Sequence, residues 1–292
     1  MDGTCKLCRN NGILEESHFI PKFVGKWLKR TSITGYLRQS DEVKKRRQDI
    51  EKEYWLCGDC EDLFSVWETK FANQVFFPVV DKGLSVIEYG EWMGKLCASL
   101  SWRTLTYIRS KNYNENEDEN YANSINTAER HLAKYLLGEE KTVGIYEQHL
   151  FPLGEIAATT DTGLPKNINR FFLRSIGMDI VGNYNGTFIY TKLPSFILLG
   201  LVSHNRIERM RSSRISMKKG KISPRKYHWP KGFINYIVEK ANQITDSYDK
   251  IPDEHKQKFE EFIQNNPDKA ANSKLFKAFL ADYEMFGKDV FR

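Results

Sequence analysis

Four of the five cysteines in this 292-residue chain occur in two closely spaced pairs, Cys5–Cys8 and Cys57–Cys60. Each Cys-x-x-Cys turn presents two thiolates, so two turns supply the four sulfur ligands of a tetrahedral zinc site. Two disulfides or a redox-active pair are the alternatives. Disulfides require an oxidising compartment, and a redox pair requires a βαβ scaffold that the flanking sequence lacks. We therefore expect the four cysteines to hold one structural Zn²⁺.

The second cysteine pair stands at the start of a predicted helix, because apolar residues follow it at helical spacing. This apolar face comprises Leu63, Phe64, Trp67, Phe71 and Val75. An early cysteine turn, extended chain and a second pair at a helix start are typical of a treble-clef zinc finger, predicted over residues 1–75. The fifth cysteine, Cys97, lies in an apolar stripe at helical spacing and is expected in the core.

Residues 16–23, between the two pairs, read Glu-Ser-His-Phe-Ile-Pro-Lys-Phe. We expect His18 to end a strand and Pro21 to begin a short helix. The cysteine turn, this His-x-x-Pro element and the Leu-Cys-x-x-Cys helix start together resemble the zinc-stapled form of the HNH (ββα-metal) nuclease family, over residues 5–70. The same residues are similar to a group of bacterial proteins, some from mobile-element or phage-defence loci, with the pattern CxxC…SHxIPKF…LCxxCE.

This resemblance implies a metal-dependent endonuclease. In the HNH family the His of His-x-x-Pro is the general base for phosphodiester hydrolysis, and a divalent cation stabilises the leaving oxygen. By position, His18 corresponds to the base, and Glu61 corresponds to the helix residue that binds Mg²⁺ or Mn²⁺. The chain departs from the family pattern, because Ser17 replaces an acidic residue and the central Asn is missing, with Gln48 and Asp49 as its nearest substitutes. A purely structural His18 is therefore the alternative.

The rest of the chain predicts an α+β fold, with a helical region over residues 76–160 and an α+β region over 161–292. Helical spacing covers residues 91–110 and 120–137, and the polar, acidic stretch between them is expected to be a solvated loop. A short helix is predicted after a turn at 163–166, followed by a small antiparallel sheet and amphipathic helices. The predicted ranges are 167–176 for the helix, 178–181, 187–190 and 195–202 for the strands, and 233–248, 255–264 and 273–286 for the final helices.

The strongest charge signal lies at residues 204–231, with ten basic residues against the single acid Glu208. Such density favours an anionic partner, and interleaved aromatic residues can stack on unpaired bases. A solvated, mobile basic loop is the alternative. The candidate nucleic-acid contacts are Arg206, Arg209, Arg211, Arg214, Lys218, Lys219, Lys221, Arg225, Lys226 and Trp229, with Lys231, Tyr227 and His228 beside them.

The composition excludes several other classes of protein. The formal charge is only +6, and 40% of the residues are hydrophobic, which is enough for a packed core. The N-terminus lacks the pattern of a signal peptide, and the most apolar stretch, residues 193–202, is too short to span a membrane. We therefore expect a cytoplasmic protein.

The leading hypothesis is an HNH-like endonuclease that acts on DNA or RNA in bacterial defence against phages or mobile elements. Its cofactors would be a structural Zn²⁺ and a catalytic Mg²⁺ or Mn²⁺. One alternative is a non-catalytic zinc finger that binds nucleic acid. Another is an interaction subunit that docks a protein partner encoded in the same operon.

Overall fold

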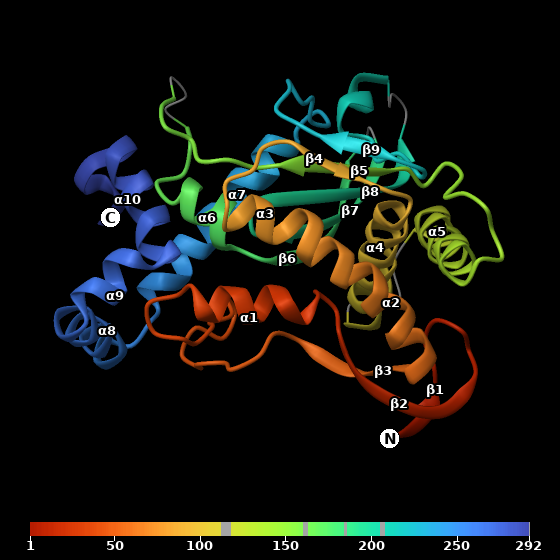
Figure 1. Ribbon diagram of the computed structural model, residues 1–292, viewed down its shortest axis with the longest axis horizontal. Helices are drawn as coiled ribbons and strands as arrows, with labels where there is room; N and C mark the ends of the chain where they lie inside the picture. Colours follow the sequence, from red (N-terminus) through yellow and green to blue (C-terminus); the bar gives the residue numbers. More distant parts are fainter. Residues whose placement is uncertain (112–117, 160–162, 184–185, 205–207, 292) are drawn as a thin grey trace. The chain divides into compact units, whose positions relative to one another are not determined.

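The computed structural model describes residues 1–111, 118–159, 163–183, 186–204 and 208–291. The chain forms two compact units. Unit 1 combines residues 1–21, 51–152 and 176–228, and unit 2 combines 22–50, 153–175 and the chain from 229 onward. Both units are built from segments that are separate in the sequence. The contiguous regions 1–75, 76–160 and 161–292 expected from the sequence stay a prediction. The expected mixture of helices and small antiparallel sheets is confirmed (Figure 1).

The central sheet of unit 1 is antiparallel, with the strand order β5-β8-β7-β6. Its strands are β5 (Gln148–Pro152), β6 (Gly177–Asn183), β7 (Gly186–Leu193) and β8 (Phe196–His204). Three of them match the predicted strands, and β5 was not predicted. Residues 148–151 are all buried, so β5 lacks the polar–apolar alternation by which a half-buried strand is recognised. A Pro194–Ser195 turn joins β7 to β8, and Ser195 has a positive φ of +63°, as residue i+2 of a type II turn requires.

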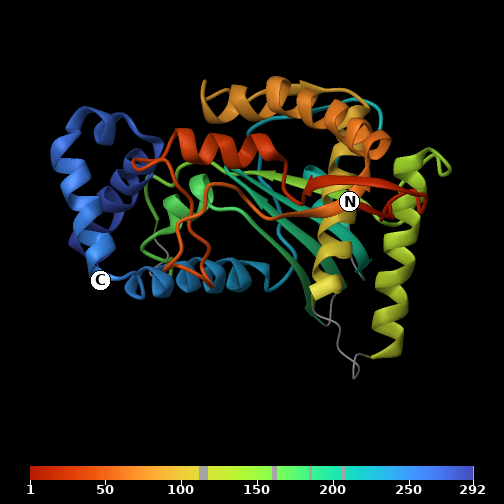
Figure 2. The ribbon, with the colours of Figure 1, turned by 90° about the horizontal axis from the view of Figure 1, so that it is seen from below.

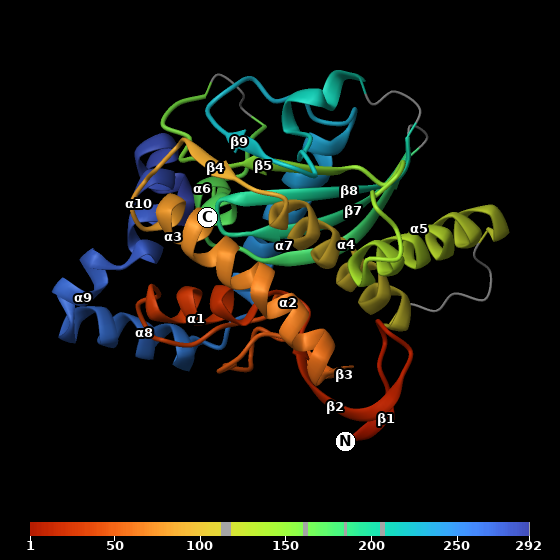
Figure 3. The same cartoon turned by 45° about the vertical axis from the view of Figure 1, so that its right-hand side comes forward.

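Helix α4 (Trp92–Lys111) packs against this sheet (Figure 3). Two buried hydrogen bonds fix its position, from Ser101 Oγ to Gln148 Oε1 at 2.7 Å and between the hydroxyls of Thr104 and Thr191 at 2.8 Å. Cys97 is 1% exposed on α4 and belongs to the core, as expected. Helix α5 (Glu119–Leu137) runs beside α4 (Figure 2). Most of the acidic stretch predicted to be a loop before α5, residues 112–117, lies outside the described residues.

The N-terminal part of unit 1 is a three-stranded antiparallel sheet followed by a helix. The sheet has the order β1-β2-β3, with β1 (Asp2–Thr4), β2 (Asn11–His18) and β3 (Lys52–Cys57), and it leads into α2 (Gly58–Phe71). A π-helical turn (Ala72–Phe76) and α3 (Phe77–Val80) continue from α2. Aromatic packing joins this part to α4, because the Phe19 ring lies 4.6 Å from Trp55 and 4.0 Å from Tyr107 between centroids. The predicted strand end at His18 is confirmed.

Unit 2 is helical, and polar contacts of α6 connect several of its helices. Its helices are α1 (Lys22–Arg30), α6 (Ile168–Arg174), α7 (Phe233–Asp249), α8 (Asp253–Asn265), α9 (Pro267–Asn272), α10 (Lys274–Phe286) and a short 3₁₀ turn (Gly287–Phe291). Arg170 of α6 pairs with the buried Asp282 of α10 at 2.8 Å, and Asn167 donates to the carbonyl of Ala241 in α7 at 2.8 Å. Arg174 donates to the carbonyl of Leu28 at the end of α1 at 2.9 Å. Among the residues that the structure describes, no helix is both long enough and apolar enough to cross a membrane.

Candidate metal centre and basic surface

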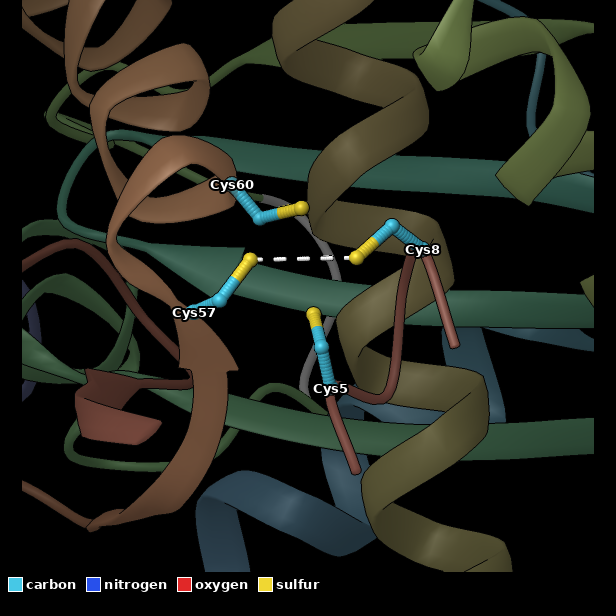
Figure 4. Close-up of side chains that lie close together, drawn as sticks. All are labelled: Cys5, Cys8, Cys57 and Cys60. Carbon is cyan, nitrogen blue, oxygen red and sulfur yellow. Dashed lines mark hydrogen bonds between the residues drawn. The ribbon is translucent and has the colours of Figure 1, made fainter. Parts of the chain in front are cut away.

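The four paired cysteines converge at one point in unit 1 (Figure 4). Cys5 and Cys8 come from the turn between β1 and β2, Cys57 ends β3, and Cys60 lies in the first turn of α2. Their sulfur atoms all lie within 4.8 Å of one another, and the Sγ atoms of Cys8 and Cys57 are 3.7 Å apart. The expected four-cysteine cluster is therefore confirmed. All four are free thiols, as is Cys97.

The sulfur geometry fits a tetrahedral zinc ion. A Zn–S bond of about 2.3 Å places two sulfurs of a tetrahedron about 3.8 Å apart, which the Cys8–Cys57 separation matches. The chemistry of the donors fits as well, since soft thiolates favour zinc over magnesium or calcium. Cys5 and Cys60 are buried, and Cys8 and Cys57 are partly exposed. The site is thus consistent with a structural Zn²⁺ bound by four cysteines.

Backbone N–H groups around Cys5 favour the thiolate form that a metal requires. Burial alone would raise the pKa of Cys5, but hydrogen bonds from the N–H groups of Cys57, Cys8 and Leu7 hold this pKa at about 7. Burial raises the pKa of Cys60, and the neighbouring thiols raise it further. A bound cation would remove this repulsion, because it stabilises all four thiolates together. The turn that presents Cys5 and Cys8 places Arg9 at a positive φ of +65°.

A buried polar cluster surrounds the side chain of Arg103 on α4. The guanidinium pairs with Glu68 of α2 at 2.7 Å and donates to the carbonyl of His18 at 2.9 Å. The Arg103 side chain is only 4% exposed, and it also lies over the Phe64 ring at 5.1 Å. One arginine therefore connects the end of β2, the helix that carries Cys60, and the central helix of unit 1.

Glu61, the predicted Mg²⁺ or Mn²⁺ ligand, belongs to this polar cluster. Burial raises the pKa of Glu61, and the carboxylates of Glu68 and Glu15 also raise it. The hydroxyl of Ser17 and the charge of Arg103 lower this pKa, but the net shift is upward. Glu61 thus shares the positive charge of Arg103 with Glu68. A divalent cation at Glu61 would lie close to this guanidinium and be repelled by it.

His18, the predicted base, is the last residue of β2, and Glu61, the predicted metal ligand, lies in the first turn of α2. Ser17 and His18 are consecutive residues that pair regularly with Glu53 and Lys52 of β3. Consecutive side chains of a strand point to opposite faces. Ser17 is 1% exposed, and its hydroxyl donates to the Glu15 carbonyl at 3.4 Å and accepts from the Leu56 N–H at 3.1 Å. Strand alternation therefore predicts the His18 side chain on the opposite face. Ser17 and Arg103 both act on the pKa of Glu61, and the catalytic role of His18 stays a prediction.

The basic segment, in the part that unit 1 contains, is fixed to the fold; we call residues 208–228 the basic strap. It begins with a 3₁₀ turn (Glu208–Ser213) and contains β9 (Gly220–Ile222), which pairs with β4 (Ile87–Tyr89). Between these elements, the Ile215 N–H donates to the carbonyl of Gln148 in β5 at 2.8 Å. Among the strap side chains that the structure describes, those of Met210, Ser213, Ile215 and Ile222 are buried.

The basic side chains of the strap that the structure describes face solvent. Seven of the predicted contacts are exposed: Arg211, Arg214, Lys218, Lys219, Lys221, Arg225 and Lys226. Arg214 pairs with Glu147 at 2.9 Å but keeps about half of its side chain exposed. Arg225 bonds within the strap, to the Lys221 carbonyl and the Ser223 hydroxyl, both at 3.0 Å. Arg206 lies outside the described residues, and so does the side chain of Arg209.

The aromatic residues near the end of the basic segment are used in packing. The Tyr227 ring packs against Phe151 with centroids 5.9 Å apart, and its hydroxyl donates to the carbonyl of Ser223 at 2.9 Å. Trp229 belongs to unit 2, where it stacks on Phe233 with ring planes 12° apart. Lys231 is exposed in the same unit. The predicted stacking of Trp229 on a base would have to compete with this ring contact.

Sequence reasoning missed the buried histidine that holds the strap to β5. His149 is fully buried, and its Nδ1 lies 3.0 Å from the hydroxyl of Ser213, which itself donates to the carbonyl of Met210. Burial lowers the pKa of His149 to about 4, so the ring is neutral and donates from Nδ1 to Ser213. The alternation of buried and basic residues at 210–215 is the sequence signal that indicates an attached rather than a free segment.

Comparison with protein-family models, with curated proteins and with solved structures found no match. The resemblance to the HNH family therefore stays a prediction that rests on residues 5–70. The site has to be interpreted from its own chemistry.

Proposed function

We propose that this protein binds nucleic acid through the basic strap, and that its cysteine centre is a structural zinc site. The observation that carries this proposal is the fixed strap itself, with seven exposed basic side chains on a backbone held by buried residues. Lys and Arg contacts to phosphates supply most of the sequence-independent affinity for nucleic acid. A partner with one negative charge per phosphate fits this surface.

The attachment of the strap supports binding better than a mobile loop would. An ordered segment has already lost most of its conformational freedom, so less of the binding free energy is spent on ordering it. The backbone bonds at Ile215 and β9 and the buried side chains of Met210 and Ile222 supply this order. Glu147 pairs with Arg214 of the strap at 2.9 Å, and Arg214 still keeps 54% of its side chain exposed, so its charge remains accessible to a partner.

In this proposal the zinc module is a treble-clef finger with a structural role. The turn at Cys5–Cys8 corresponds to its knuckle, and Cys57–Cys60 to the pair at its helix start. Arg103 and the aromatic contacts of Phe19 fix the module to α4, and α4 also supports the sheet next to the strap. The metal would therefore act on binding by stabilising unit 1 rather than by touching the nucleic acid.

Neutralising three strap lysines tests this proposal. The triple variant Lys218→Gln/Lys219→Gln/Lys221→Gln is expected to bind a duplex at least about tenfold more weakly near physiological salt, because three phosphate contacts are lost. Each lost contact should also reduce the slope of log K against log salt by about 1. Fluorescence anisotropy over a range of salt concentrations, with labelled DNA and RNA, measures both quantities.

The matched control carries the same change of charge elsewhere on unit 1. Lys6, Lys70 and Lys82 are also exposed, so Lys6→Gln/Lys70→Gln/Lys82→Gln should leave the affinity within about twofold. Equal losses in both triple variants would show that overall charge, not the strap, determines binding. A wild-type protein that binds neither DNA nor RNA would refute the proposed function.

Endonuclease activity is the second candidate function. The observation that favours it is the arrangement β2–β3–α2, in which His18 ends β2 and Glu61 lies in the first turn of the helix. The positive charge of Arg103, which acts on Glu61, favours the structural role. The test is cleavage of plasmid, single-stranded DNA and RNA with Mg²⁺ or Mn²⁺ by the wild type, His18→Ala and Glu61→Ala.

The two candidates predict different results in this cleavage assay. The binding proposal predicts no cleavage by any of the three proteins under conditions where the wild type binds. Cleavage by the wild type that falls at least about a hundredfold in His18→Ala would establish the endonuclease instead, since general-base catalysis is worth about 10²–10⁴ in rate.

A further inference from the structure

Two of the four clustered cysteines are accessible from solvent. Cys8, in the turn between β1 and β2, and Cys57, at the end of β3, are both partly exposed. By contrast, Cys5 is 0% exposed and Cys60 is 4% exposed. The oxidation of a cysteine follows its exposure as well as its thiolate character, because the oxidant has to reach the sulfur. Cys8 and Cys57 are therefore the members of the cluster that a small oxidant reaches most easily.

The sulfur atoms of these two cysteines also lie next to each other. Their separation is 3.7 Å, and Figure 4 shows the two side chains pointing toward one another. A disulfide bond is about 2.05 Å long, so the two sulfurs have to approach by roughly 1.7 Å to form one. Cys8 and Cys57 are 49 positions apart in the sequence, so this bond would join the first cysteine turn to the end of β3.

We propose that a hydroperoxide joins Cys8 to Cys57 in a disulfide, which makes the cysteine centre a redox-sensitive switch that gives up its metal. The two thiolates that form the disulfide are half of the four-sulfur ligand set. The buried Cys5 and Cys60 would then be the only two sulfur ligands left of the four that a structural zinc site needs. This inference rests on the zinc site of the proposed function and does not involve the basic strap.

The reaction balances with hydrogen peroxide as the oxidant. One thiolate attacks a peroxide oxygen, the O–O bond breaks, and a sulfenic acid and a hydroxide ion are formed. The second thiolate attacks the sulfenic sulfur, the S–S bond forms, and a second hydroxide ion leaves. The two sulfurs together lose two electrons, and the peroxide is reduced to two molecules of water once both hydroxide ions are protonated. A thiol reductant reverses the bond by exchange, so the metal can be bound again.

The test treats the zinc-loaded full-length protein with hydrogen peroxide, and a chromogenic chelator measures the released zinc. Trypsin cleaves after Lys6 and Arg9, and an Asp-specific protease cleaves before Asp59, so the four cysteines lie in four separate peptides. Non-reducing mass spectrometry should find the Cys8 peptide linked to the Cys57 peptide, with about one such link for each zinc ion released. Dithiothreitol and added zinc should restore the metal content.

Cys8→His separates the disulfide from other damage to the site. Histidine is also a zinc ligand, so this variant keeps four donors but cannot form the disulfide. Peroxide should release its zinc at least about tenfold more slowly than that of the wild type. Cys57→His carries the same expectation and serves if Cys8→His holds no zinc before treatment. Cys97→Ala is the matched control, because Cys97 lies outside the cluster, and it should lose zinc at the wild-type rate.

The possible outcomes separate the switch from the zinc site itself. A Cys8–Cys57 link, together with slower zinc release from the histidine variant, would support the proposal. A main product within either Cys-x-x-Cys pair, zinc release without a disulfide, or release from the histidine variant at the wild-type rate would overturn it. A wild type that keeps its zinc while free cysteine is fully oxidised would overturn it as well. An untreated, reduced protein without zinc would refute the zinc site, and the switch with it.

Discussion

Replacing Cys60 with serine is expected to abolish stoichiometric zinc binding and to unfold β1, β2, β3 and the start of α2. Cys60 is 4% exposed and supplies one of the four sulfurs. A structural zinc site contributes on the order of 10 kcal/mol in small metal-folded modules, which is more than this short sheet can supply by itself. Elemental analysis measures the metal content, and amide hydrogen exchange should show lost protection in residues 1–21 and 51–62.

Cys97→Ala is the matched control for this experiment. Cys97 is equally buried but lies on α4 apart from the cluster, so its loss should cost about 1 kcal/mol and leave the zinc content unchanged. Full zinc occupancy in Cys60→Ser, or loss of zinc in Cys97→Ala, would contradict the assignment of the metal ligands.

The second large effect is expected at Arg103. Arg103→Met should reduce the free energy of unfolding by about 3–5 kcal/mol, because it leaves Glu68 and Glu61 close together without the positive charge between them. The His18 carbonyl would also lose its charged donor. Urea denaturation followed by tryptophan fluorescence measures this change, since Trp55 and Trp102 lie in the same part of unit 1.

A double-mutant cycle separates this ion pair from simple packing. Arg103→Met/Glu68→Gln should cost at least about 1 kcal/mol less than the sum of the single variants, because removing the unpaired carboxylate relieves the penalty. Arg109 and Glu129 are a matched pair at 2.6 Å, but Arg109 is one-third exposed. We expect Arg109→Met to cost about 1 kcal/mol. Additive effects at Arg103 and Glu68 would show that the pair contributes no coupling.

The features predicted from the sequence are those that depend on nearby residues. The Cys-x-x-Cys spacing identified the four thiols that meet in the cluster. Helical spacing predicted α4 and α5 to within about one residue at each end, and it predicted a helix start at the second cysteine pair, where α2 begins. The strands on either side of the predicted turn at 183–186 and the short, buried run of β8 were equally predictable, whereas residues 184–185 of that turn lie outside the described residues.

The features that were missed depend on partners far away in the sequence. β4 and β9 contain three residues each and pair across more than a hundred positions, so neither has a local signal. Arg103 follows Leu100 and Trp102 in an apolar helix, and only the fold shows that Glu68 and the His18 carbonyl surround it. Likewise, nothing near Glu61 in the sequence indicates that Ser17 and Arg103 act on its carboxylate.

Zinc K-edge X-ray absorption of the purified wild-type protein tests the central claim most directly. The account predicts about one zinc per chain with four sulfur ligands at about 2.3 Å, because all four thiols lie within 4.8 Å of one another. A metal-free protein with Cys5, Cys8, Cys57 and Cys60 in disulfides, or a zinc ion with nitrogen or oxygen atoms among its four ligands, would contradict it.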